Sequence, residues 1–110
     1  MLLKVIDALG NPQTIITQGQ EAVVDHSGTI MSTGQSQLGL SANALRSGWC
    51  LQNVGTSPVW CNTLGADAAA GAGSFMVPVG GMFPPAGYPV TTDAVNLLGT
   101  ASSAFSLLEW

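Results

Sequence analysis

Turn-forming residues interrupt this chain at intervals of about ten residues, the spacing of turns in domains built from short strands. The chain contains 14 Gly and 6 Pro, and no stretch between them has the 3.6-residue apolar period of an amphipathic helix. Short apolar runs bounded by such residues are typical of antiparallel sheets. We therefore expect a single all-β domain, an antiparallel β-sandwich of a jelly-roll-like kind with an extended N-terminal arm.

The expected strands follow the apolar and β-branched runs between these turns. They are Leu2–Ala8, Thr14–Thr17, Glu21–Asp25, Gln35–Leu40, Gly48–Val54, Pro58–Asn62, Ser74–Val79, Val95–Gly99 and Ala104–Glu109. The segment Ala42–Leu45 suits one helical turn, with Ser41 as a candidate N-cap.

The large aromatic residues divide the chain into two regions. All Trp and Phe residues follow residue 48, so most of the apolar area for a core lies in the second region. We expect residues 1–34 to form an N-terminal arm or attachment segment and residues 35–110 to form the sandwich, with Gly28–Gly39 as a linker. Isolated short strands are marginal, so the arm is predicted to add to a neighbouring protein while residues 35–110 fold without it.

Charge is scarce in this chain. Charged residues make up 7% of the sequence, the net charge is −4, and Lys4 and Arg46 are the only cations. No basic patch can form, so phosphate-neutralising binding to nucleic acid is excluded. A surface of small uncharged residues is weakly solvated and favours assembly, and we expect a homo-oligomer.

The N-terminal sequence MLLKVIDALG is not expected to be a signal peptide, because Lys4 and Asp7 interrupt its apolar residues. The segment 68–92 carries no charge, but Gly and Pro occur throughout it, so we do not expect a membrane span. Synthesis in a reducing cytoplasm follows as the expectation.

The segment RSGWCLQNVGTSPVWCN, residues 46–62, is predicted to be a hairpin with a type II′ turn at Gly55-Thr56. In that register Cys50 faces Cys61 and Leu51 faces Trp60. The predicted core face carries Trp49, Leu51, Asn53 and Trp60, and the opposite face carries Cys50, Gln52, Val59 and Cys61.

The two cysteines allow four interpretations. A zinc site needs about four ligands, and the chain has no second Cys/His cluster. A redox pair calls for CxxC spacing or a nearby cation, and His26 lies in the other region. A disulfide is geometrically allowed in the hairpin register. We favour two free thiols packed among their neighbours.

Several other motifs resemble functional sites. Asp25-His26-Ser27 has the residue types of a catalytic triad, but consecutive residues on a strand point to opposite faces, so we interpret DHSG as a polar turn. The loop Gly71–Ser74 lacks the lysine of a phosphate-binding loop.

The remaining charged residues suggest no site for a metal ion. Asp67 and Asp93 lie outside any acidic cluster, so no calcium site is predicted. Arg46 and Glu109 are a candidate surface salt bridge joining the first and last core strands, where such a pair contributes at most ~1 kcal/mol. No catalytic residue, metal or cofactor is expected.

From Asn43 onward, about two thirds of the chain resembles small virion proteins of tailed bacteriophages. The resemblance rests on NALRSGWCLQNVGTSPVWCN, GAGSFMVPVGG and TTDAVNLLGTASSAFSLLEW. The matching positions are Arg46, Gly48, Gln52, Asn53, Trp60, Gly71, Gly73, Pro78, Gly80, Gly81, Val95, Gly99, Phe105, Glu109 and Trp110. Such proteins are capsid decoration (cement) proteins, head fibres or tail-associated β-sandwich modules, commonly trimeric. The resemblance brings no catalytic residues and does not cover the N-terminal third.

The resemblance implies a non-enzymatic structural protein of a phage virion, made in the host cytoplasm. Its expected partners are its own copies, in a homo-oligomer that the resemblance implies to be a trimer, and the major capsid protein or other virion proteins, whose joints it would seal. The alternative is a receptor- or glycan-binding module, whose mark would be exposed Trp, Tyr88 or Phe83 beside Asn or Asp. An enzyme is the least favoured class, because no acid, base and nucleophile converge.

Overall fold

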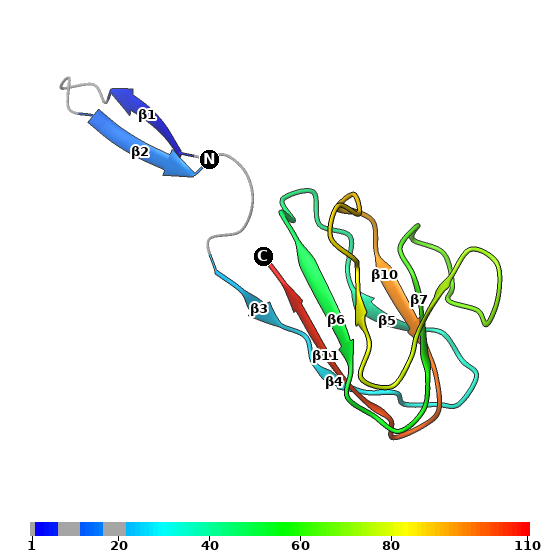
Figure 1. Ribbon diagram of the computed structural model, residues 1–110. Helices are drawn as coiled ribbons and strands as arrows, with labels where there is room; N and C mark the ends of the chain where they lie inside the picture. Colours follow the sequence, from blue (N-terminus) through cyan, green and yellow to red (C-terminus); the bar gives the residue numbers. More distant parts are fainter. Residues whose placement is uncertain (1, 7–11, 17–21) are drawn as a thin grey trace.

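The computed structural model of the protein describes residues 2–6, 12–16 and 22–110, and every regular element in them is a β-strand. The strands are β1 (Leu2–Ile6), β2 (Pro12–Ile16), β3 (Val24–Asp25), β4 (Gly28–Thr29), β5 (Gln37–Leu40), β6 (Trp49–Asn53), β7 (Val59–Asn62), β8 (Phe75–Val77), β9 (Met82–Phe83), β10 (Val95–Leu98) and β11 (Ala104–Glu109). β1 and β2 pair with each other as a separate antiparallel sheet (Figure 1). The other strands form two antiparallel sheets that pack together, which confirms the predicted all-β sandwich.

The strand order of these two sheets is that of a jelly roll. One sheet has the order β5-β10-β7-β8, and the other has the order β3-β11-β6-β9, with β4 also pairing with β11. When β3 and β4 are counted as one interrupted strand, the two orders become 2-7-4-5 and 1-8-3-6. Most connections therefore cross from one sheet to the other, as in double-sheet jelly rolls.

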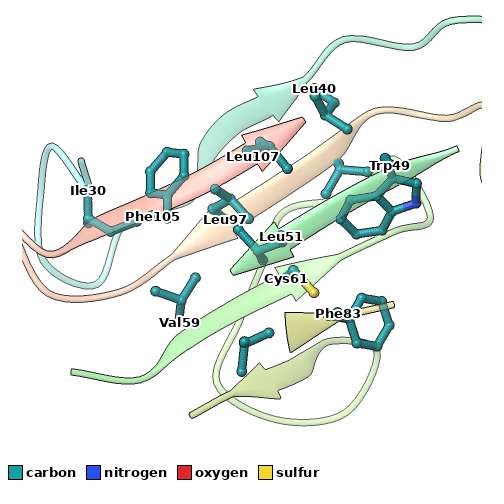
Figure 2. Close-up of a cluster of buried hydrophobic side chains, with 12 residues drawn as sticks. Ile30, Leu40, Trp49, Leu51, Val59, Cys61, Phe83, Leu97, Phe105 and Leu107 are labelled. Atoms are coloured by element: carbon teal, nitrogen blue, oxygen red, sulfur yellow. The ribbon is translucent and has the colours of Figure 1, made fainter. Parts of the chain in front are cut away.

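The core lies between the two sheets and is built by strict alternation. Buried and partly exposed residues alternate along β6, β10 and β11, because successive side chains of a strand point to opposite faces. Figure 2 shows the inward side chains of both sheets gathered in one cluster. Its members are Ile30, Leu40, Trp49, Leu51, Val59, Cys61, Val77, Phe83, Val95, Leu97, Phe105 and Leu107.

The predicted hairpin at residues 46–62 is wrong, because β6 and β7 lie in different sheets. Gly55 does not have the left-handed φ that a type II′ turn requires at this position. It is glycine for a different reason: a Cβ there would collide with Ser103 Oγ and would lie 2.8 Å from the Ala104 backbone nitrogen. The connection thus passes against the start of β11 as it crosses between the sheets.

The buried Asn53 holds this crossing in place. Its Oδ1 accepts a hydrogen bond from the Gly55 N–H at 3.0 Å, and its Nδ2 donates to the carbonyls of Ser57 and Val77. One side chain therefore joins the end of β6 to the approach to β7 and to β8. The predicted burial of Asn53 beside Trp49 and Leu51 is confirmed.

Trp60 does not share that core face. In the register of its own sheet, Val59 and Cys61 point inward and are buried. Trp60 lies on the outer face, opposite Met76 on β8 and Leu98 on β10. The predicted grouping of Cys50, Gln52, Val59 and Cys61 on one outer face is wrong for the same reason, since Val59 and Cys61 belong to the core.

The predicted boundary at residue 34 falls inside the sandwich. β3 and β4 pair with β11, and Ile30 is 1% exposed in the core. Figure 1 shows β3 and β4 along β11, on the side away from β6. The predicted linker Gly28–Gly39 contains β4 and most of β5, so it is also wrong.

The structure corrects one further local prediction and adds the strand β9 to those expected. The expected helical turn at Ala42–Leu45 is instead a hydrogen-bonded turn in which the Arg46 N–H donates to the Asn43 carbonyl. The sequence also gave no sign of β9, because its strand is only two residues long.

Candidate functional site

Arg46, Glu109 and His26 form a largely buried network at one end of β11. Arg46 Nε donates to Glu109 Oε2 at 2.7 Å, and His26 Nε2 lies 2.9 Å from Glu109 Oε1. The remaining guanidinium nitrogens donate to the carbonyls of Thr91, Asp93 and Ser41. The predicted Arg46–Glu109 pair is therefore present, but it is buried and not at the surface as expected.

This network is saturated by its own members. Burial raises the pKa of Glu109, but hydrogen bonds and charge from Arg46 and His26 outweigh it, so the pKa lies below its ordinary value. Both Glu109 oxygens and the Arg46 nitrogens already have partners within the protein. The arrangement positions the loops around residues 41–48 and 91–93 against β11, and it leaves no carboxylate free for acid–base chemistry.

Asp25, His26 and Ser27 do not line up as a catalytic triad. Asp25 Oδ1 accepts from the Ser27 N–H at 2.8 Å, and Ser27 Oγ accepts from the Leu107 N–H at 2.9 Å. His26 faces Glu109 on β11. The segment predicted to be a polar turn links β3 and β4 along the edge of a sheet.

Cys50 and Cys61 are both free thiols, in β6 and β7 of opposite sheets. Burial raises the pKa of Cys61 to about 12 and also raises the pKa of Cys50. Both side chains are therefore protonated thiols near neutral pH, the form that is neither nucleophile nor metal ligand. The expectation that they occupy adjacent strands is wrong, because the hairpin that would have paired them does not form.

The other motifs have structural partners as well. Asn62 Nδ2 donates to the Gly73 carbonyl, and Ser74 Oγ accepts from the Ala69 N–H, so the loop Gly71–Ser74 folds back on β7. Within residues 22–110, no group of three His, Cys, Asp or Glu side chains gathers as a metal site would require. Asp67 and Asp93 are exposed and belong to different loops.

A depression of about 320 Å³ opens between the loop after β7 and the loop before β10. It is lined by Thr63, Leu64, Tyr88, Pro89, Val90 and Thr91. The Tyr88 hydroxyl lies 3.1 Å from Thr63 Oγ1, and Thr91 Oγ1 donates to the Thr63 carbonyl at 2.8 Å. Because these polar atoms are paired with each other, the surface offered to a ligand is mostly apolar.

An aromatic cluster supports this depression from the core side. Tyr88 packs edge-on against Phe83 and Phe75, with ring centroids 5.0 and 6.0 Å apart, and Phe83 also contacts Trp49. Of the aromatics expected to mark a binding site, Phe83 is buried and Tyr88 is partly buried at the depression. The sequence could not indicate the Thr residues, since their placement depends on how two distant loops meet.

The surface of the sandwich is almost free of charge. Within residues 22–110, burial of Arg46 and Glu109 leaves Asp25, Asp67 and Asp93 as the exposed charged side chains, all acidic. Large apolar side chains are exposed over the same residues. They are Val23, Val24, Met31, Leu38, Leu45, Val54, Leu64, Phe75, Met76, Val79, Met82, Val90 and Trp110.

Comparison with protein-family models, curated proteins and solved structures finds no match to this chain. A search of the described residues for a helix long and apolar enough to cross a membrane also finds none.

Proposed function

We propose that this protein is a non-enzymatic structural component of a phage virion, a decoration or cement protein that stabilises a capsid shell through subunit contacts. The observation that carries the proposal is a jelly-roll sandwich whose outer surface is nearly uncharged and rich in exposed apolar side chains. Jelly rolls are common among viral capsid domains. The resemblance to phage virion proteins from Asn43 onward points to the same class.

The balance of surface groups supports a role in contacts between proteins. Interface centres are depleted in charge and enriched in Met and aromatic residues. This surface exposes Phe75, Met76, Met82 and Trp110 and keeps its Arg–Glu pair inside. Such a surface is poorly suited to a free monomer and well suited to burial against neighbours.

The hairpin β1–β2 is the proposed attachment element. Its register pairs Leu2 with Ile16 and Leu3 with Ile15, so apolar residues oppose one another along it. A two-stranded hairpin of this size is at most marginally stable alone, and it gains stability by adding to another sheet. In this proposal the hairpin joins a shell subunit, and the sandwich covers the joint beside it.

Co-sedimentation tests this function. Empty shells assembled from the major capsid protein of the phage that encodes this chain would be mixed with the full protein and with a variant that lacks residues 1–21. We expect the full protein to pellet with the shells to a saturating ratio and the variant to remain in the supernatant. A full protein that never pellets contradicts the proposal, and a variant that pellets normally places the attachment surface on the sandwich.

The depression beside Tyr88 favours a second candidate, a receptor- or glycan-binding module. An aromatic ring next to threonine hydroxyls at a loop end is an arrangement in which a sugar ring can stack. The test is binding to host cell-wall polysaccharide by Val90→Arg, at the mouth of the depression. Val54→Arg is the control, since Val54 is similarly exposed in a different loop. Loss of polysaccharide binding in the first variant alone supports this candidate, and no binding by the unaltered protein rejects it.

A further inference from the structure

We propose that the sandwich self-associates head to tail, with the edge formed by β8 and β9 of one copy packing against the edge formed by β3, β4 and β5 of the next copy. This inference rests on the proposed function and names the surfaces through which the protein would oligomerise. The two surfaces are called the β8–β9 edge and the β3–β5 edge.

The β8–β9 edge closes one side of both sheets. β8 is the last strand of one sheet and β9 is the last strand of the other. The exposed apolar residues there are Phe75, Met76, Val79 and Met82, whose exposed fractions lie between 46% and 61%. No charged residue lies in residues 75–83. Across the outer face, Met76 is paired in register with Trp60, and Trp60 is paired with Leu98.

The β3–β5 edge closes the opposite side of both sheets. β5 ends the first sheet, and β3 and β4 end the second. Its exposed apolar residues are Val23, Val24, Met31 and Leu38, and Asp25 is the one acidic residue on its strands. The molecule therefore carries two apolar edges of similar make-up on opposite sides.

The area of these edges fits an interface between two copies. At roughly 200 Å² for a fully exposed large residue, four half-exposed residues present roughly 400 Å² of surface. Joining the two edges removes about 800 Å² of mainly apolar surface, which implies about 1,400 Å² in total because interfaces are roughly 57% non-polar. Stable protein interfaces bury about 1,200–2,000 Å².

A second copy of the chain is the partner that covers both edges. Any other protein bound at one edge leaves the opposite apolar edge in water, whereas head-to-tail contacts bury each edge in every copy. Strand direction is consistent with this contact. Every pairing in both sheets is antiparallel and each main sheet path has four strands, so the two edge strands of a sheet run in opposite directions. The edge strands of successive copies therefore meet in antiparallel orientation. Contacts between two different patches generate closed rings when the rotation between copies permits.

Lysine substitutions at each edge test the proposal by light scattering after gel filtration. The variants are Leu38→Lys on the β3–β5 edge and Met76→Lys on the β8–β9 edge. Leu45→Lys is the control, because Leu45 is as exposed as Leu38 but lies in the loop before β6. We expect at least three times the monomer mass of 11.2 kDa for the unaltered protein and the control, and the monomer mass for each edge variant.

Mixing the two edge variants identifies the geometry. Each retains the edge that the other has lost, so a head-to-tail interface predicts a one-to-one heterodimer in the mixture. Contacts between identical edges predict no such dimer, and that result overturns the proposal, as do edge variants that keep the full oligomer mass. If circular dichroism shows that either variant is unfolded, Met31→Lys and Met82→Lys replace them at the same edges. If the unaltered protein is monomeric but pellets with shells, the head-to-tail self-association is overturned and the capsid function is not. If the protein forms an oligomer that depends on these edges but never pellets with shells, only the capsid function is overturned.

Discussion

Arg46 Nε donates to Glu109 Oε2 over 2.7 Å, joining two residues 63 positions apart in the chain at a buried site. The same guanidinium donates to the carbonyls of Thr91 and Asp93, and the same carboxylate contacts His26. One ion pair therefore ties the loops at Arg46 and at Thr91 and Asp93, which have no strand pairing with each other, to β11. Its loss should loosen that end of the sandwich as a unit.

Replacing Glu109 with leucine should destabilise the protein by about 3–5 kcal/mol, because Arg46 would be left as a buried cation without its carboxylate. The double variant Arg46→Met/Glu109→Leu should lose less than the two single variants together, since no buried charge remains. Urea unfolding of the unaltered protein, the single variants Arg46→Met and Glu109→Leu, and the double variant measures the coupling free energy between Arg46 and Glu109. Asp67→Asn, which removes an exposed carboxylate, is the control, and additive losses would contradict the account.

Acid should weaken the fold through Glu109. Its folded-state pKa lies below the ordinary value of 4.5, so its contribution is fully present above pH 4.5 and is lost as the pH falls through the folded pKa. The melting temperature should therefore drop more steeply below pH 4.5 in the unaltered protein than in Glu109→Gln. Parallel profiles for the two proteins between pH 7 and pH 2 would show that this carboxylate does not carry the acid sensitivity.

Strand positions could be predicted from the sequence, but the sheet to which each strand belongs could not. β11 matches its predicted segment, and the burial of Trp49, Leu51 and Asn53 follows from local alternation. Alternation says nothing about which strand lies next to which, so the sequence pattern predicts β7 beside β6 with Trp60 inward. The large apolar ring of Trp60 reinforced that error, although Val59 and Cys61 fill the core instead.

The candidate site was less accessible from sequence for a related reason. Arg46 and Glu109 were identifiable as partners because few other charges exist, but their burial depends on the loop that carries Thr91 and Asp93. Ile30 falls within the predicted arm because all Trp and Phe residues follow residue 48, yet it is buried in the core and its backbone is hydrogen-bonded to Ser102 and Ser103 in the turn between β10 and β11. Such contacts join distant segments, and local patterns do not report them.

Both thiols should react only slowly with a disulfide reagent in the native protein. Thiol counting with a disulfide reagent should give two per chain after denaturation without reductant, and Cys50 should react before Cys61 in the folded state. Cys61 is fully buried and burial raises its pKa to about 12, whereas Cys50 is partly exposed. Cys50→Ala should abolish the faster native phase. Finding no thiols in denatured material would mean that a disulfide forms, against the placement of the two cysteines in opposite sheets.

Gly55→Ala should destabilise the fold by about 1–3 kcal/mol, the usual cost of forcing extra atoms into a packed site. The new methyl group would meet Ser103 Oγ and the Ala104 backbone nitrogen, neither of which lies at the end of a long flexible chain. Gly28→Ala is a matched control, because a Cβ there would lie 3.7 Å from Phe105 Cζ, an ordinary contact. Thermal unfolding compares them, and equal melting temperatures would reject the role assigned to Gly55.

Removing residues 1–21 should leave a sandwich that melts cooperatively, whereas removing residues 1–34 should not. The shorter deletion spares β3, β4 and Ile30, and the longer one strips a pairing partner from β11 and opens the core. Circular dichroism melts of the two variants test this. If the variant lacking residues 1–34 melted cooperatively at a temperature near that of the full chain, the predicted domain boundary at residue 34 would be correct.

The position of β11 in its sheet means that the sandwich cannot be completed until its last strand has been synthesised. This strand lies between β3–β4 and β6, so it occupies the middle of its sheet, yet it is synthesised after every other strand of the sandwich. Until it emerges, β6 has no partner on that side and the β3–β4 segment has none at all. A nascent chain or a prematurely terminated product therefore cannot adopt the shape of the finished protein, because contacts between distant segments must wait for their last member. Incomplete chains would be left for proteolysis.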